Sequence, residues 1–134
     1  MKAQPSLEVQ RDVAPTILIV EDEVLIRFDL AERLRGEGYV VIEASDGDEA
    51  LAIMGLVSAV ALIVSDVRMP GKIDGVMLAA LIKQQTPHIK VMLVSGHLSK
   101  SAMDAVADVS LSKPVNPLIL LEHVKKLVGE PVKR

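Results

Sequence analysis

Two short stretches decide the fold of this 134-residue chain: TILIVED at residues 16–22 and ALIVSD at residues 61–66. Each is a run of aliphatic residues that ends in acidic residues. Such continuous apolar runs are typical of strands buried on both faces of a parallel sheet. Further largely apolar runs lie at residues 39–43, 89–94 and 109–111. The sequence therefore predicts five strands.

Helical patterns separate these strands. Residues 23–35 place apolar side chains at helical spacing: Ile26, Leu30 and Leu34, with Phe28 and Ala31 beside them. Further helices are expected over residues 45–57, through residues 78–82 and over residues 100–107. The last helix begins with Asn116 as N-cap and Pro117 at the first helical position, and ends at Gly129. Strands that alternate with helices predict an α/β fold whose parallel sheet has right-handed crossovers.

The length predicts one domain, which we place at residues 16–129 between a flexible tail at residues 1–15 and a short tail at residues 130–134. The longest uncharged stretch, residues 50–65, is shorter than the roughly 20 residues of a spanning helix. Residues 1–14 lack the apolar block of a signal peptide. We therefore expect a cytoplasmic protein that does not enter a membrane.

The composition excludes several classes of function. Eighteen acidic residues against 15 basic ones give a net charge of −3, which argues against DNA binding by neutralisation of phosphates. The chain has no cysteine, so disulfides, thiolate metal sites and cysteine nucleophiles are excluded. The histidines His88, His97 and His123 have no ligand-like spacing, and we interpret His88 and His123 as surface residues.

Five polar side chains follow four of the predicted strands: Glu21, Asp22, Asp66, Ser95 and Lys113. Because parallel strands end at one edge of their sheet, these side chains should converge there. Clustered carboxylates repel unless a cation shares them, and hard oxygen ligands suit Mg²⁺. A carboxylate beside a divalent ion, a lysine and a hydroxyl meets the needs of phosphoryl transfer to an aspartate.

The same residues resemble a known family. ILIVEDE at residues 17–23, LIVSDVRMP at 62–70 with Asp74 and Gly75, VSG at 94–96 and SKP at 112–114 resemble the receiver domain of two-component response regulators. The four motifs come in the family's order and cover about residues 16–129. The resemblance implies a flavodoxin-like (βα)5 fold with a five-stranded parallel sheet in the order 2-1-3-4-5.

By this resemblance, Asp66 accepts a phosphoryl group from a sensor histidine kinase or a histidine phosphotransfer protein. The resemblance also implies four ligand groups for Mg²⁺: the carboxylates of Glu21, Asp22 and Asp66 and the backbone carbonyl of Arg68. Lys113 is expected to pair with the phosphoryl oxygens, and Ser95 to be the switch hydroxyl that bonds the phosphoryl group. The family also implies a cis peptide bond between Lys113 and Pro114.

Three features depart from the family pattern. Ser110 stands where receivers usually carry Tyr or Phe, so the output mechanism should differ. The segment between Ser95 and Lys113 is about a helical turn short, which predicts a short or irregular helix there. The loop at residues 69–74 has one residue more than the commonest form.

Plainer interpretations remain for single residues. Glu21 and Asp22 could cap the first helix, and Ser95 could belong to an ordinary turn. Arg68 and His97 could tune access of water to the site or be plain exposed side chains.

We expect a stand-alone receiver that signals through a downstream protein target or passes the phosphoryl group on. The contact surface implied by the family comprises the helix near residue 100, the strand after it and the last helix. A homodimer is compatible with this prediction. One alternative is a receiver-like module that binds its partner without phosphorylation, motivated by Ser110. Another is a phosphohydrolase, although its usual Asp-x-Asp pair is replaced here by the adjacent Glu21 and Asp22.

Overall fold

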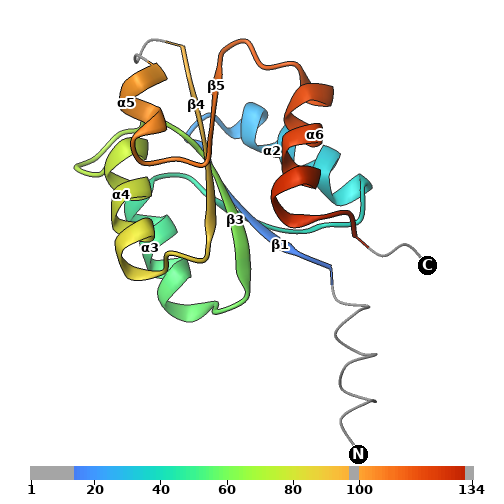
Figure 1. Ribbon diagram of the computed structural model, residues 1–134, viewed down its shortest axis with the longest axis horizontal. Helices are drawn as coiled ribbons and strands as arrows, with labels where there is room; N and C mark the ends of the chain where they lie inside the picture. Colours follow the sequence, from blue (N-terminus) through green and yellow to red (C-terminus); the bar gives the residue numbers. More distant parts are fainter. Residues whose placement is uncertain (1–13, 97–99, 132–134) are drawn as a thin grey trace, which may run out of the picture.

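The computed structural model describes residues 14–96 and 100–131 (Figure 1). Strands and helices alternate along these residues in ten elements: β1 (Thr16–Val20), α2 (Val24–Gly36), β2 (Val40–Ala44), α3 (Gly47–Leu56), β3 (Val60–Asp66), α4 (Gly75–Gln85), β4 (Lys90–Ser95), α5 (Lys100–Asp104), β5 (Val109–Ser112) and α6 (Pro117–Val128). The strands form one parallel sheet in the order β2-β1-β3-β4-β5. The predicted fold class and strand order are confirmed.

The sheet lies between two layers of helices, with α3, α4 and α5 on one face and α2 and α6 on the other (Figure 1). Alternate residues of β1 supply the two cores. Leu18 and Val20 pack toward α3 and α4, whereas Ile17 and Ile19 pack toward α2 and α6. Each of these four side chains is at most 1% exposed, and burial of such a side chain contributes about 1.5–3 kcal/mol. Two-sided burial explains the continuous apolar runs of the central strands.

The predicted helix starts match the observed caps. Asp46 accepts a hydrogen bond from the Glu49 backbone N–H at 2.8 Å and begins α3. Asn116 accepts one from the Leu118 backbone N–H at 2.8 Å, and Pro117 is the first residue of α6. Helix α5 has five residues, which confirms the short helix expected between Ser95 and Lys113, although it ends three residues earlier than predicted.

The predicted apolar stripe of the first helix is wrong in its first turns. Ala31 and Leu34 are buried against the sheet, but Ile26 is 45% and Phe28 57% exposed. The first turns of α2 leave the end of β1, so the sheet lies under the second half of the helix only. Helical periodicity defines a face, but it does not show how much of that face the sheet covers.

The end of α6 is attached to the turn before β2. The Tyr39 hydroxyl donates a 2.7 Å hydrogen bond to the Gly129 carbonyl, and Pro131 is buried against Gly38. Gly38 has a positive φ of 107°, and a Cβ there would lie 3.1 Å from the Pro131 ring. Most of both predicted tails lies outside the described residues, so the domain limits remain predictions.

Two of the three histidines can be placed. His88 is exposed and His123 half-buried on α6, whereas His97 lies outside the described residues. Within the described parts of the chain, no helix combines the length and the apolar character needed to cross a membrane.

Candidate functional site

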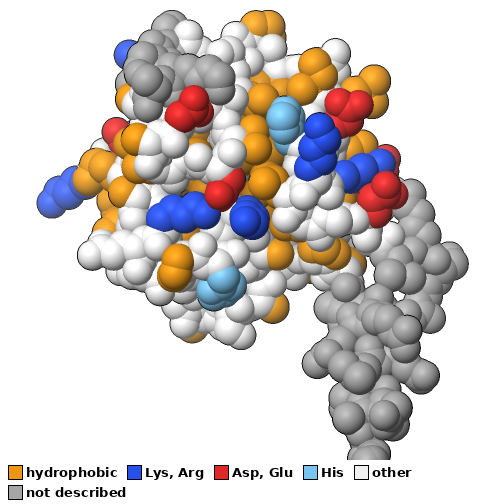
Figure 2. Space-filling model, in the orientation of Figure 1, with side chains coloured by type: hydrophobic (Ala, Val, Ile, Leu, Met, Phe, Trp, Pro, Cys, Tyr) orange, Lys and Arg blue, Asp and Glu red, His pale blue; other side chains and the backbone are white. Residues whose placement is uncertain are grey.

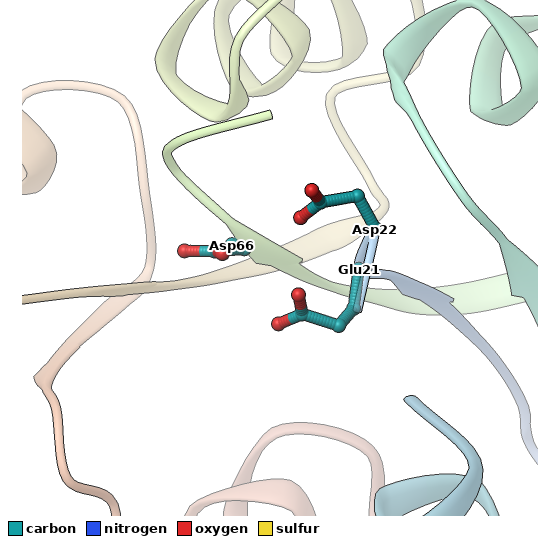
Figure 3. Close-up of side chains that lie close together, drawn as sticks. All are labelled: Glu21, Asp22 and Asp66. Carbon is teal, nitrogen blue, oxygen red and sulfur yellow. The ribbon is translucent and has the colours of Figure 1, made fainter. Parts of the chain in front are cut away.

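The predicted cluster forms at the carboxyl edge of the sheet. Glu21 and Asp22 follow β1, whereas Asp66 and Ser95 are the last residues of β3 and β4. The parallel register pairs Val20 with Ser65 and Asp66 with Val94, so these strand ends lie side by side. Figure 3 shows the carboxylates of Glu21 and Asp22 extending toward the space beside Asp66.

Three carboxylates lie within reach of one ion. One oxygen each of Glu21, Asp22 and Asp66 lies within 4.8 Å of the others. The side chains of Glu21 and Asp66 are 7% and 9% exposed, whereas Asp22 is exposed. The cluster is therefore buried on one side and open to solvent on the other, as a partly hydrated cation requires.

Lys113 supplies an ammonium group to this cluster. Its Nζ donates to Asp66 Oδ2 at 3.1 Å and lies 3.8 Å from Glu21 Oε1. Lys113 follows β5 directly, and the Lys113–Pro114 peptide bond is cis, as the resemblance implied.

The pKa values of Glu21 and Lys113 both lie above their ordinary values. Burial raises the pKa of Glu21 above its ordinary value, and the charges of Asp66 and Asp22 raise it further. The Glu23 backbone N–H and Lys113 oppose this rise without cancelling it. Burial lowers the pKa of Lys113, but the Asp66 hydrogen bond and the charges of Asp66 and Glu21 outweigh burial and raise it. Three carboxylates thus share one ammonium group, which is hydrogen-bonded to Asp66.

A hollow of about 790 Å³ opens beside the cluster. Its lining includes Asp22, Ser95 and three members of the loop after β3: Arg68, Lys72 and Asp74. Ser95 is 4% exposed, whereas Arg68 is exposed. The structure therefore places both predicted residues around the same opening as Asp22.

The backbone of Asp66 is held from several directions. Its carbonyl accepts a 2.8 Å hydrogen bond from Ser65 Oγ, and the Gly75 N–H donates to the Val67 carbonyl at 2.8 Å. A Cβ on Gly75 would overlap the Asp66 carbonyl oxygen and lie 2.7 Å from Val67 Cα. Only glycine lets the start of α4 approach the acceptor strand this closely.

Sequence reasoning missed three supporting residues of the site. Ser65 and Gly75 support the backbone of Asp66, and Arg27 Nη1 donates to the Glu21 carbonyl at 2.7 Å. Ser65 and Gly75 belong to the quoted motifs, but the sequence did not show that they contact the backbone near Asp66. Arg27 lies outside those motifs, and its contact depends on how α2 leaves β1.

The residues present fit a divalent cation. Carboxylate oxygens are hard ligands, and three of them converge. Burial is the largest cause of the raised pKa of Glu21, and repulsion by Asp66 and Asp22 adds to it. A cation at this point would relieve that repulsion.

The comparisons with known proteins agree with this geometry. The sequence profile of the response regulator receiver domain matches residues 17–125. The chain belongs to this family. Receiver domains are phosphoacceptor signalling domains of two-component systems and bind Mg²⁺ at an acidic pocket.

Individual relatives support this assignment. The chain is 40% identical over 129 residues to the transcriptional regulatory protein PdtaR of Mycobacterium tuberculosis, covering 93% of this chain and 62% of that protein. A receiver domain protein of Clostridium thermocellum superposes with a TM-score of 0.79 at 28% identity, covering 85% of this chain and 94% of the other. The response regulator TrrA of Thermotoga maritima, solved in complex with Mg²⁺–BeF, gives 0.77 at 34% identity, covering 84% and 98%. The chain thus spans less than two thirds of the curated relative.

Proposed function

We propose that this receiver accepts a phosphoryl group on Asp66 from a phosphohistidine of a sensor histidine kinase or a histidine phosphotransfer protein. The observation that carries the proposal is the position of Asp66, whose carboxylate lies beside both an ammonium group and two further carboxylates. An oxygen of Asp66 bonds to phosphorus, the P–N bond of the phosphohistidine breaks, and the leaving imidazole nitrogen keeps the electron pair and takes up a proton.

Mg²⁺ would be held by Glu21, Asp22, Asp66 and the backbone carbonyl of Arg68. When bound, it supplies positive charge that offsets the negative charge of the phosphoryl oxygens. Lys113 is already hydrogen-bonded to Asp66, so its ammonium group can move to a phosphoryl oxygen over a short distance. Ser95 lines the same opening as Asp22 and offers the switch hydroxyl.

The output is proposed to be binding of a downstream protein, or onward transfer of the phosphoryl group, without DNA binding by these residues. The surface of α5, β5 and α6 is the proposed contact face, and it can also serve a homodimer. Figure 2 shows apolar side chains along the middle of this face between charged side chains of both signs. Ile119 on α6 is 47% exposed. Mixed charge around an apolar strip suits a protein partner better than a nucleic acid.

One observation favours a second candidate, a module that binds its partner without phosphorylation. Ser110 is 7% exposed on β5, and its small side chain replaces the aromatic ring that receivers usually carry there. The intact acid cluster argues for phosphorylation, so one experiment must decide between the two functions.

The test is the intact mass of the protein after incubation with Mg²⁺ and acetyl phosphate. We expect one added phosphoryl group in the parent and none in Asp66→Asn. Asp74→Asn is the matched control, since Asp74 lines the same hollow but caps α4 by accepting the Met77 N–H at 2.8 Å, which asparagine can also do. Labelling of Asp66→Asn would refute the proposal. If no adduct forms on the parent, failure to bind beryllofluoride would favour the second candidate.

A further inference from the structure

Arg27 connects the metal-binding turn to a neighbouring strand. From α2, its Nη1 donates to the Glu21 carbonyl at 2.7 Å and its Nε donates to Glu43 Oε1 on β2 at 3.2 Å. The Arg27 side chain is 17% exposed and that of Glu43 is 27% exposed. Both contacts are therefore partly shielded from water, where charge-assisted hydrogen bonds are strong.

Arg27 also bridges the turn that carries the acids. Its backbone N–H donates to the Glu23 carbonyl at 2.9 Å, while its side chain holds the Glu21 carbonyl. Asp22 lies between these two anchor points. Fixing both ends of so short a turn restricts the directions in which Glu21 and Asp22 can present their carboxylates.

Glu43 fixes the guanidinium in turn. Its second oxygen, Oε2, accepts from Arg35 at 3.1 Å, and Arg35 donates to the Val41 carbonyl on β2 at 2.9 Å. The carboxylate is thus held between two arginines at the edge strand. A planar guanidinium can serve two acceptors that lie in different directions, which a lysine ammonium does less well at this geometry.

We propose that Arg27 is a positioning residue for the cation site, kept in place by Glu43. It acts by orienting Glu21 and Asp22 toward the space shared with Asp66, and it contacts neither the phosphoryl group nor the cation. Its removal should weaken cation binding and leave the transfer step intact once the site is filled. This inference rests on the proposed function, because it assumes that Mg²⁺ binds at the acid cluster.

The test is calorimetric titration of the metal-free chain with Mg²⁺. Loss of a group that orients a ligand typically costs 10–100-fold in metal affinity. We expect Arg27→Met to lose about tenfold in Mg²⁺ affinity, because Arg27 holds the backbone of Glu21 and not a carboxylate ligand itself. Arg33→Met is the matched control. Arg33 is on the same helix and pairs with Asp29 at 2.9 Å, but it is 55% exposed and does not contact the turn. Its affinity should stay within about twofold of the parent.

A second readout separates positioning from general damage. The half-saturating Mg²⁺ concentration for phosphorylation by acetyl phosphate should rise about tenfold in Arg27→Met, whereas the rate at saturating Mg²⁺ should stay within about twofold of the parent. A structural defect alone would raise this concentration and also lower the rate at saturating Mg²⁺. Glu43→Gln keeps a neutral acceptor for Arg27, so the half-saturating Mg²⁺ concentration should rise less than in Arg27→Met. This second variant provides the test if Arg27→Met does not fold.

Each outcome has a defined meaning. Mg²⁺ affinity within twofold of the parent in Arg27→Met, or an equal loss in Arg33→Met, overturns the inference and leaves the proposed function standing. If Arg27→Met does not fold, an unchanged affinity in Glu43→Gln overturns it as well. A parent chain that does not bind Mg²⁺ overturns the proposed function and the inference together.

Discussion

Two lysine–aspartate pairs lie at opposite edges of the sheet and differ in the number of acidic side chains around the lysine. At the carboxyl edge, Lys113 Nζ is 3.1 Å from Asp66 Oδ2. At the amino edge, where β4 and β5 begin, Lys83 Nζ is 2.6 Å from Asp108 Oδ2. By distance alone, the second pair would be taken as the stronger.

The partners of each pair show what the difference means. Asp108 also accepts the Val91 N–H at 2.8 Å, and Lys83 donates to the Ile89 carbonyl at 2.9 Å. Burial raises the pKa of Asp108, but Lys83 and the Val91 N–H outweigh it, so the pKa lies below its ordinary value. The single acid Asp108 lies beside Lys83 and also feels the charge of Lys90, whereas Lys113 lies beside a cluster of three acids. We infer that balanced charge marks the structural pair and unbalanced charge marks the functional one.

Exchanging each lysine for methionine gives the largest expected contrast. Lys113→Met should slow phosphorylation by acetyl phosphate about 100-fold or more, because a preorganised donor to the developing phosphoryl charge is lost. Lys83→Met should leave this rate unchanged and reduce the free energy of unfolding by about 1–2 kcal/mol, since its pair is only partly buried. Rates from intact mass and stabilities from urea titration measure the two effects. Equal losses of phosphorylation rate in both variants would contradict the assignment of Lys113 as functional and Lys83 as structural.

The acidic edge also depends on close contact between backbones, which gives the next largest effect. Gly75→Ala should destabilise the protein by about 3 kcal/mol, because its Cβ would overlap the Asp66 carbonyl oxygen. Gly55→Ala is the matched control: Gly55 is in α3 with nothing within 4 Å of its Cβ position, and should gain about 0.5 kcal/mol from helix propensity. Urea unfolding followed by far-ultraviolet circular dichroism measures both. A Gly75→Ala variant as stable as the parent would show that α4 can move away from Asp66 at little cost.

Asp108→Asn examines the balanced pair through its pH dependence. A lowered folded-state pKa means that ionised Asp108 stabilises the fold above its unfolded pKa, near 3.8, and that this stability is lost as pH falls below that value through the folded pKa. The variant should therefore be about 1 kcal/mol less stable than the parent at pH 7 and approach it below pH 3.8. Asp29→Asn, at an exposed pair on α2, should change little at either pH. Urea titrations across this range measure the difference, and a loss independent of pH would contradict the assignment.

Glu21→Gln examines the unbalanced cluster and gives the smallest effect. The pKa of Glu21 is raised in the fold, so its ionised form disfavours folding above the folded pKa, and this cost is absent below its ordinary value of 4.5. In metal-free protein at pH 7, the variant should be about 0.5 kcal/mol more stable than the parent, and the gain should vanish below pH 4.5. Added Mg²⁺ should stabilise the parent more than the variant. Thermal melts with and without Mg²⁺ provide the measurement. A variant less stable than the metal-free parent at pH 7 would show that the cluster is already balanced.

The local sequence pattern was enough to predict the strands and their alternation with helices along the chain. β1 covers residues 16–20, the aliphatic part of the stretch at residues 16–22, and Asn116 and Pro117 start α6 as predicted. Aliphatic runs define buried strands by themselves, and caps are read from adjacent residues. The meeting of Glu21, Asp22 and Asp66 could also be predicted, because parallel strands bring their carboxyl ends to one edge.

Local pattern was not enough where an outcome depends on how elements pack. The spacing of Ile26 and Phe28 fits a buried face, but the sheet does not extend under the first turns of α2. The pairing of Lys83 with Asp108 joins α4 to the residue before β5, and no motif links them. Such contacts depend on the distance between elements and on side-chain rotamers.

The sequence by itself determined the α/β alternation, the two-sided burial of the central strands and the residue types at the edge where they end. These follow from local composition and from the direction of parallel strands. Only the tertiary structure decided that Lys83 pairs with a single acid and that Lys113 lies beside a cluster of three. It also decided that Arg27 reaches the Glu21 carbonyl and that Gly75 lies against Asp66. The charges around a lysine and the contacts of a backbone both depend on residues from distant parts of the chain. Those residues become neighbours only when the helices pack on the sheet.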